Sequence, residues 1–408
     1  MKEKILPILI IVLAIAVAIP LTMIGYKLTG YAVVESGPID YQGDDFNVLV
    51  IGWDGVQRDH FFECYNKERI NCPDGIPNLK ELSGDNIYNL TITNGATDTK
   101  AGWSQMFTGN KAEVTGVYNN KEYQPIPEGY TIFEKLENQL GEDNITTLFI
   151  GGKNWHIGGT CPGEIGQGGE IEVFGEPWCL AKNNIDYWEN NIGGNNKVRD
   201  KALELLDQHA YERFFFFIHF RDPDQTGHKY GENKNRYSNR IKNDDRKLGE
   251  IIIKLKELGI YNKTFIYVVT DHGFGENKKA HQNAPYGFFA SNDPDIVRSS
   301  NRMDITPTLL EKYGLSLGAI GDAPAVNGQS LYSIPTECVS EGNGFVDYLG
   351  APQCCSGLSL INLKNIKANG NCRAPTGGTG DNSGLCTNCG DGICTPPEHK
   401  CNCKKDCS

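Results

Sequence analysis

Residues 46–55, Phe-Asn-Val-Leu-Val-Ile-Gly-Trp-Asp-Gly, are a short and nearly continuous apolar run that ends in an aspartate. An apolar run of this length without alternation is typical of a strand buried on both faces of a parallel sheet. Similar runs recur at residues 147–150, 214–220 and 264–269. The sequence therefore predicts a buried parallel sheet, with Asp54 at the carboxyl end of its first strand.

Helical patterns lie between these runs, at residues 132–140, 198–209 and 246–258. Strands that alternate with helices predict an α/β fold, here a three-layer α/β/α sandwich with a mainly parallel central sheet. Residues 304–314 predict a further helix, with proline in its first turn and glycine at its end. Ligands of such folds collect beyond the carboxyl ends of the strands, so polar residues that follow the apolar runs are candidates for a site.

The N-terminus carries an apolar run from Ile5 to Ile24, preceded by Lys2 and Lys4. A run of about 20 residues can span a bilayer, and leading lysines favour a cytoplasmic N-terminus. We therefore predict a signal anchor at residues 1–29 and a polar linker at 30–44. The protein is then a single-pass membrane protein with an extracellular catalytic domain. A cleaved signal peptide, which would give a secreted protein, is the alternative.

The 14 cysteines agree with export, because an oxidising compartment uses them as disulfides. Cys64 with Cys72 and Cys161 with Cys179 form two close pairs in the sequence, and the rest begin at Cys338. We predict a catalytic domain at residues 45–335 that contains a disulfide-tied insertion at 152–195. A Gly/Asn-rich tail at 336–385 and a Cys-rich disulfide module at 386–408 follow. Zinc ribbons use comparable cysteine spacing, but export favours disulfides.

Amino-acid composition and net charge limit the kinds of molecule that the protein is expected to bind. The 408 residues carry a formal net charge of −12 and 39% hydrophobic residues, enough for a sizeable core. No basic face stands out, so we expect no binding to a nucleic-acid duplex. The oligomeric state is not predicted by the sequence.

Acidic and imidazole side chains follow the predicted strands in four segments of the chain. They combine carboxylates with histidines, a set of ligands that suits zinc and also manganese or iron. Any one of these residues alone is a weak signal, and their joint occurrence at strand ends is the evidence. The candidate ligands are Asp54, Asp224, His228, Asp271, His272 and His281.

A fifth segment, residues 97–109, supplies candidate nucleophiles. A hydroxyl of this kind is a poor nucleophile at its own pKa, and coordination to a metal ion would activate it. The residue types alone leave four choices open, namely Thr97, Thr99, Ser104 and Thr108.

These blocks, in this order and spacing, resemble the alkaline phosphatase superfamily, and most of all its nucleotide pyrophosphatase/phosphodiesterase and sulfatase-like branch. The resemblance runs from about Asn47 to Leu331. In that branch the nucleophile lies ten positions before the glycine of a Thr-Gly pair, which here is Gly109. The resemblance thus implies Thr99 as the nucleophile and a covalent phospho-threonine that water hydrolyses.

The resemblance also implies two divalent metal ions, which we expect to be zinc, with manganese or iron as alternatives. One would be held by Asp224, His228 and His281. The other would be held by a set that includes the nucleophile, namely Asp54, Thr99, Asp271 and His272.

Two further residues are implied as contacts of the substrate. Diesterases of the branch hold a phosphate oxygen with an asparagine, which aligns with Asn120, with Asn119 as a near rival. Lys100 follows the nucleophile and would either pair with a substrate oxyanion or point into solvent. The residues of a sulfatase motif, Cys/Ser-x-Pro-x-Arg, are absent at positions 99–103, which argues against ordinary sulfatase activity.

The sequence therefore predicts an extracellular metal-dependent phosphoric ester hydrolase, most similar to phosphodiesterases. Its substrate would be a phosphate ester, either a small molecule or a lipid or glycan head group. A sulfatase-like hydrolase and a phospho-head-group transferase of the same superfamily are alternatives. A non-catalytic cell-surface binding protein is the alternative from another class.

Overall fold

The computed structural model describes residues 45–333, apart from 93, 167, 168, 277 and 283, and short stretches between 344 and 407. The main body is an eight-stranded sheet in the order β4-β3-β5-β1-β6-β7-β2-β8. Its centre is parallel and consists of β3 (Thr146–Gly151), β5 (Phe214–Phe220), β1 (Asn47–Trp53) and β6 (Thr264–Val269). The predicted α/β class and the mainly parallel sheet are confirmed.

The remaining strands form the two margins of this sheet. β4 (Tyr187–Glu189) pairs in parallel with β3 at one edge. On the other side, β7 (Tyr286–Ser291) is antiparallel to both β6 and β2 (Ile87–Thr91), and β2 pairs in parallel with β8 (Ser300–Asn301). The antiparallel strand β7 is the main departure from the predicted parallel order.

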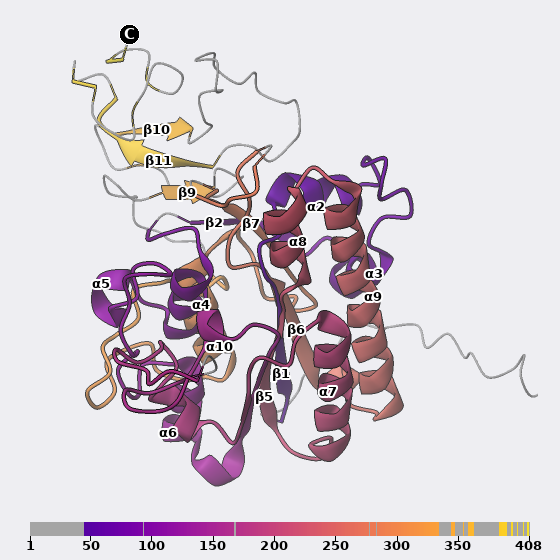
Figure 1. Ribbon diagram of the computed structural model, residues 1–408, viewed down its shortest axis with the longest axis vertical. Helices are drawn as coiled ribbons and strands as arrows, with labels where there is room; N and C mark the ends of the chain where they lie inside the picture. The colour runs from indigo at the N-terminus through magenta and orange to yellow at the C-terminus, as the bar shows by residue number, and fades with distance from the viewer. Residues whose placement is uncertain are drawn as a thin grey trace, which may run out of the picture. The chain divides into compact units, whose positions relative to one another are not determined.

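Helices cover both faces of the sheet, so the sheet is a middle layer (Figure 1). One face carries α2 (Arg58–Tyr65), α3 (Pro77–Ser83), α7 (Asn195–Gln208) and α9 (Asn235–Glu257). The opposite face carries α4 (Thr99–Thr108), α5 (Ala112–Thr115), α6 (Ile132–Leu140) and α10 (Ile305–Lys312). α8 (Asp222–Tyr230) begins two residues after the end of β5. The predicted helices at 132–140 and 198–209 match α6 and α7 closely.

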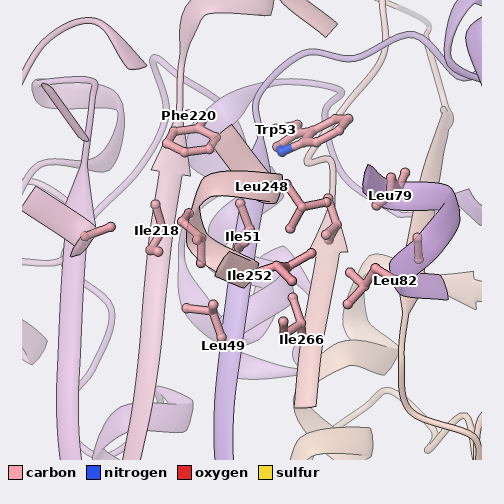
Figure 2. Close-up of a cluster of buried hydrophobic side chains, with 14 of the residues drawn as sticks. Leu49, Ile51, Trp53, Leu79, Leu82, Ile218, Phe220, Leu248, Ile252 and Ile266 are labelled. Carbon is pink, nitrogen blue, oxygen red and sulfur yellow. The ribbon is translucent and has the colours of Figure 1, made fainter. Parts of the chain in front are cut away.

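Alternate side chains of the central strands build the core on the α9 face. Leu49, Ile51 and Trp53 of β1 pack under Leu248 and Ile252 of α9 (Figure 2). Every residue of β1, β5 and β6 is buried, on both faces. Because successive strand residues point to opposite faces, a strand covered on both sides reads as an unbroken apolar run. This unbroken apolar pattern is the feature from which the sequence predicts the sheet.

The core on the α4 face is aromatic. Trp103 and Phe107 of α4 pack on Phe217 of β5, with ring centroids 5.0 and 4.5 Å apart. Phe133 of α6 lies 4.9 Å from Phe215. Large rings fill the wide gap between a helix layer and a sheet, so these contacts fix how close α4 lies to the carboxyl end of β5.

The segment predicted as an insertion, residues 152–195, is tied by the predicted disulfide between Cys161 and Cys179. It contains β4, which extends the sheet, and two 3₁₀ turns, Trp155–Ile157 and Ala181–Asn184. Cys64 and Cys72 form the other predicted disulfide, next to α2. The insertion is therefore anchored to the sheet at both of its ends.

The C-terminal cysteines that the structure describes are also in disulfides, as predicted. They pair as Cys354–Cys386, Cys389–Cys403 and Cys394–Cys407. A small antiparallel sheet in the order β10-β11-β9 lies in this part, formed by Ser359–Asn362, Ser383–Thr387 and Gly344–Val346. The predicted tail at 336–385 and module at 386–408 thus share a sheet and a disulfide.

The predicted anchor at residues 1–29 and linker at 30–44 lie outside the described residues. Within the part that the structure does describe, no helix combines the length and the apolar character needed to cross a bilayer.

Candidate active site

The sequence-predicted ligands gather at the carboxyl edge of the parallel strands. Asp54 follows β1, and Asp271 and His272 follow β6. Asp224 and His228 lie on α8, after β5, and His281 lies in the segment that returns to β7. Neighbouring parallel strands end at the same edge of the sheet. The side chains of Asp54, Asp224 and Asp271 therefore lie close together, although more than 160 positions separate Asp54 from Asp224 in the sequence.

One group of potential ligands consists of Asp54, Asp271 and His272, and all three side chains are fully buried. The Nε2 atom of His272 lies 3.6 Å from Asp54 Oδ1 and 3.5 Å from Asp271 Oδ2. The other oxygen of Asp271 accepts a hydrogen bond from the backbone N–H of Gly55, 3.1 Å away. That bond turns Oδ2 toward the histidine.

The second group consists of Asp224, His228 and His281. His228 Nε2 lies 3.3 Å from Asp224 Oδ1, and its Nδ1 is 2.8 Å from the carbonyl oxygen of Lys279. His281 is held by Thr97, whose carbonyl accepts from Nδ1 at 2.5 Å. The rings of His272 and His281 are 4.1 Å apart, so the two groups are neighbours.

Thr99 is the candidate nucleophile whose hydroxyl faces these groups. It is the first residue of α4, only 1% exposed, and its Oγ1 lies 3.4 Å from His272 Nε2. The hydroxyl of Thr97 donates to the carbonyl of His281, and that of Thr108 donates to the carbonyl of Ser104 within α4. The hydroxyl of Ser104 is buried and has no hydrogen-bond partner among the described residues. Of the four hydroxyls, that of Thr99 is the one that, within the described structure, contacts the side chain of a candidate ligand, which supports its prediction as the nucleophile.

Lys153, which sequence reasoning missed, lies at the centre of the site. Its Nζ is 2.8 Å from Asp54 Oδ2, 2.7 Å from Asp224 Oδ2 and 2.9 Å from Thr99 Oγ1. It follows β3 at the start of the insertion, in the stretch Gly151-Gly-Lys-Asn-Trp155. No rule of residue spacing identifies a lysine in such a stretch as a site residue. The one signal in the sequence was its position directly after a buried strand.

His219 is the second residue that the sequence analysis overlooked. It lies within β5, is fully buried, and its Nε2 is 2.7 Å from Asp54 Oδ2. A signal did exist, because it is the one polar residue in the run Phe-Phe-Phe-Phe-Ile-His-Phe. Its contact fixes the orientation of the Asp54 carboxylate.

Asn120 and Lys100 both lie beside Thr99. The side-chain oxygen of Asn120 accepts a hydrogen bond from the backbone N–H of Lys100 at 2.9 Å, which places its amide at the start of α4. The rival Asn119 instead bonds within its own turn, to residues 121 and 122. The Lys100 ammonium lies over the ring of Tyr123, 3.2 Å from its centroid, and does not point into open solvent.

Burial and neighbouring charges set the protonation of the site. Burial alone would raise the pKa of Asp54 and of Asp224. The Lys153 ammonium, together with His219 at Asp54 and with His228 and His272 at Asp224, holds both pKa values below normal. Burial, together with the Asp54 carboxylate, raises the pKa of Asp271 well above normal. Burial lowers the pKa of Lys153, but the carboxylates of Asp224, Asp54 and Asp271 more than compensate and raise it. Burial lowers the pKa of His281 to about 4, so its imidazole is neutral near pH 7.

Unpaired carboxylate oxygens show that the site fits cations. Asp54 Oδ1 and Asp271 Oδ2 are buried and accept no hydrogen bond within the described structure, whereas Asp224 Oδ1 contacts His228 Nε2 at 3.3 Å. All three lie within 3.9 Å of His272 Nε2. A buried carboxylate oxygen without a partner is costly, and a divalent cation shared with imidazole nitrogens would satisfy it. The structure brings together the carboxylates and histidines of each predicted set, with Thr99 Oγ1 3.4 Å from His272 Nε2. Metal binding by these residues stays a prediction.

Comparison with known proteins is consistent with this site. A family model described as type I phosphodiesterase/nucleotide pyrophosphatase matches residues 48–308, more than half of the chain. A bis(5'-adenosyl)-triphosphatase of Mus musculus, enpp4, is 35% identical over 66 residues, which are 16% of this chain and 14% of that protein. A venom phosphodiesterase of Crotalus durissus collilineatus is 29% identical over 110 residues, which are 27% of this chain and 13% of that protein. The matches thus span only about an eighth of these relatives.

Solved structures resemble the fold more distantly. Murine ectonucleotide pyrophosphatase/phosphodiesterase 5 has 14% identity and a TM-score of 0.44, over 67% of this chain and 97% of that one. A protein of the alkaline phosphatase superfamily from Vibrio parahaemolyticus has 17% identity and a TM-score of 0.46, over 76% and 74%. The family model matches residues 48–308, a range that includes all the candidate ligands, and carries the assignment. On that match, this chain belongs to the type I phosphodiesterase/nucleotide pyrophosphatase family.

Proposed function

We propose that this chain is a metal-dependent phosphoric ester hydrolase of the phosphodiesterase type, with Thr99 as its nucleophile. The observation that carries the proposal is the convergence of three carboxylates and three imidazoles, from β1, α8 and the segments after β6, on one side of the Thr99 hydroxyl. Membership of the family agrees with a hydrolase of phosphodiester or pyrophosphate bonds.

Two divalent cations would be held by the two ligand groups, Asp54 with Asp271 and His272, and Asp224 with His228 and His281. Mixed carboxylate and imidazole donors favour zinc, with manganese or iron as alternatives. When bound, such a pair lowers the pKa of oxygen nucleophiles and neutralises charge on the phosphoryl group.

The chain's own residues divide the remaining work. The Thr99 oxygen forms a bond to phosphorus while the bond from phosphorus to the ester oxygen breaks, and the hydroxyl proton passes to water. The departing oxygen takes a proton from water. A second water then attacks phosphorus, Thr99 leaves and regains its proton, and phosphate or a phosphomonoester is released. Asn120 and Lys100, beside the start of α4, would bind the non-bridging oxygens of the substrate.

We infer that the enzyme acts outside the cytoplasm, either anchored by residues 1–29 or secreted. The disulfides of the catalytic domain, Cys64–Cys72 and Cys161–Cys179, support an oxidising compartment. The substrate is a phosphate ester. Candidate substrates include bis(5'-adenosyl) triphosphate, on which a relative is named to act, and lipid or glycan head groups.

The experiment that tests the proposal is hydrolysis of bis-p-nitrophenyl phosphate by the zinc-loaded protein and by a Thr99→Ala variant. We expect Thr99→Ala to fold and to keep its zinc but to lose turnover by roughly 1,000-fold or more, because the attacking oxygen is absent. Near-normal turnover in the variant would refute the nucleophile. Zinc binding without any turnover of the unaltered protein, across diesters, monoesters and sulfate esters, would instead indicate a binding protein.

A further inference from the structure

Lys153 introduces a cation that the two ligand groups do not account for. Its side chain is 6% exposed and extends from the end of β3 to the carboxylates of Asp54 and Asp224. Between two carboxylates it is an ammonium ion that donates hydrogen bonds and accepts none. Its third contact is Thr99 Oγ1, at 2.9 Å.

The ammonium of Lys153 contacts only one oxygen of each of its two carboxylate partners. The ammonium takes the Oδ2 atoms of Asp54 and Asp224. The Oδ1 atoms of both residues lie around His272 Nε2, at 3.6 and 3.9 Å, and Asp224 Oδ1 also contacts His228 Nε2. Each carboxylate therefore offers one oxygen to the lysine and the other to the imidazole side. The contacts of the lysine therefore do not use the carboxylate oxygens that the two ligand groups share with His272.

A purely structural ion pair would not require the contact with Thr99. Two carboxylates already satisfy the ammonium electrostatically, yet its remaining hydrogen bond is directed at the proposed nucleophile. That oxygen becomes negatively charged when it attacks phosphorus, and again when the bond to phosphorus breaks. A fixed donor gains most strength where charge develops, and a buried site amplifies the effect.

We propose that Lys153 is a further catalytic residue of this chain, whose ammonium donates to Thr99 Oγ1 and stabilises the negative charge on that oxygen in both half-reactions. The proposal rests on the proposed function. Lys153 stays protonated throughout, so the proton of Thr99 goes to water in the first half-reaction and returns from water in the second. The bonds that form and break at phosphorus are those given above.

The test compares Lys153→Met with the unaltered protein and with Lys182→Met. Lys182 lies in the same insertion and pairs with Glu164 at the surface, so its loss is a matched control. Zinc affinity is measured by competition with a chromophoric chelator. Formation of phospho-Thr99 is measured in single turnovers of bis-p-nitrophenyl phosphate, quenched in acid and analysed by mass spectrometry. With this substrate one p-nitrophenol leaves, so the adduct is Thr99 esterified to p-nitrophenyl phosphate.

We expect Lys153→Met to bind zinc at least as tightly as the unaltered protein, because a competing positive charge is gone. Phosphorylation of Thr99 should slow by about 100-fold or more, the usual effect of removing one donor to a developing oxyanion. Lys182→Met should match the unaltered protein in both measurements. Phosphorylation within about threefold of normal, at full zinc occupancy, would overturn the proposal, since a structural lysine predicts that result.

A second variant covers the case in which Lys153→Met fails to fold. Zinc-loaded Lys153→Ala is assayed with ethylammonium, which can donate a hydrogen bond, and with tetramethylammonium, which carries the same charge but cannot. Rescue by ethylammonium alone supports the proposal, and failure of both ions to rescue contradicts it. If the unaltered protein forms no phospho-Thr99, the proposed function fails. If it does and Thr99→Ala does not, an active Lys153→Met refutes only the role of the lysine.

Discussion

At the scale of single residues, the site depends on how each carboxylate is oriented. Asp54 Oδ2 is contacted by Lys153 and by His219, at 2.8 and 2.7 Å. These contacts leave Oδ1 on the side of His272. A carboxylate held in this way needs no reorganisation when it binds a cation, which is the usual role of the residues around metal ligands.

Replacing His219 tests this orientation. We expect His219→Phe, which keeps a buried ring in β5 but removes the hydrogen bond, to weaken zinc binding by roughly 10–100-fold. The measurement is a zinc competition titration, with circular dichroism to confirm that the variant is folded. His209→Phe is the control, because His209 pairs with Glu212 at the surface. Equal zinc affinity in both variants would show that His219 only packs.

At the scale of elements, helix α4 sets the position of the nucleophile. All ten of its residues are buried, and Trp103 and Phe107 hold it against β5. Arg302 connects the segment that precedes α4 to the end of β6. Its guanidinium donates hydrogen bonds to the carbonyls of Asn94 and Ala96 and to that of Asp271. The position of Thr99 relative to Asp271 is therefore fixed by the packing of α4 and by one buried arginine.

Gly102 is where α4 comes closest to the ligands. A Cβ atom at this position would lie 2.7 Å from Asp271 Cβ and 3.0 Å from its carbonyl oxygen, so α4 or Asp271 has to move. We expect Gly102→Ala to destabilise the protein by about 1–3 kcal/mol, as overpacking does. Turnover should fall by about 10-fold or more, because misplacement of reacting groups by about 1 Å costs up to 100-fold.

The measurements for Gly102→Ala are urea unfolding and kcat on bis-p-nitrophenyl phosphate. Gly166→Ala is the matched control, because among the described residues a Cβ there meets the carbonyl oxygen of Glu170 at an ordinary 3.5 Å. If Gly102→Ala unfolds at a lower urea concentration but keeps its kcat, the proximity of α4 to Asp271 matters for stability alone.

At the scale of the whole molecule, the ligands come from the ends of β1 and β6, from α8 and from the segment before β7, which meet only in the folded protein. A cation bound by Asp54, Asp224, Asp271 and the histidines would therefore bind the folded state and not the unfolded chain. Such a ligand stabilises by mass action, by about 2.7 kcal/mol when its free concentration is 100 times Kd. Without a cation, the buried carboxylate oxygens that accept no hydrogen bond would destabilise the folded state further.

Removal of metal should therefore lower the thermal stability of the protein. We expect dipicolinate to reduce the melting temperature by several degrees and to abolish turnover, and added zinc to restore both. Differential scanning calorimetry provides the measurement. Asp54→Asn should respond much less to the chelator, since it lacks one ligand charge. A melting temperature that does not change with chelator would contradict a metal site of this composition.

The sequence alone determined the elements whose signal is local. The runs that became β1, β3, β5 and β6 are unbroken because each strand is covered on both faces, and α6 is visible in its apolar periodicity. The candidate ligands could be named because carboxylates and histidines directly follow these strands. The motif resemblance then indicated Thr99 among four hydroxyls.

Only the tertiary structure decided the features that depend on distant partners. β2 and β7 were not predicted, because they lie at the margin of the sheet and are selected by pairing with each other. Lys153 lies in a Gly- and Asn-rich stretch that carries no pattern, and it acquires its role from Asp54, Thr99 and Asp224, up to 99 positions away. A local sequence encodes burial and backbone preference, whereas the contacts of a single ammonium group are fixed only when four chain segments pack together.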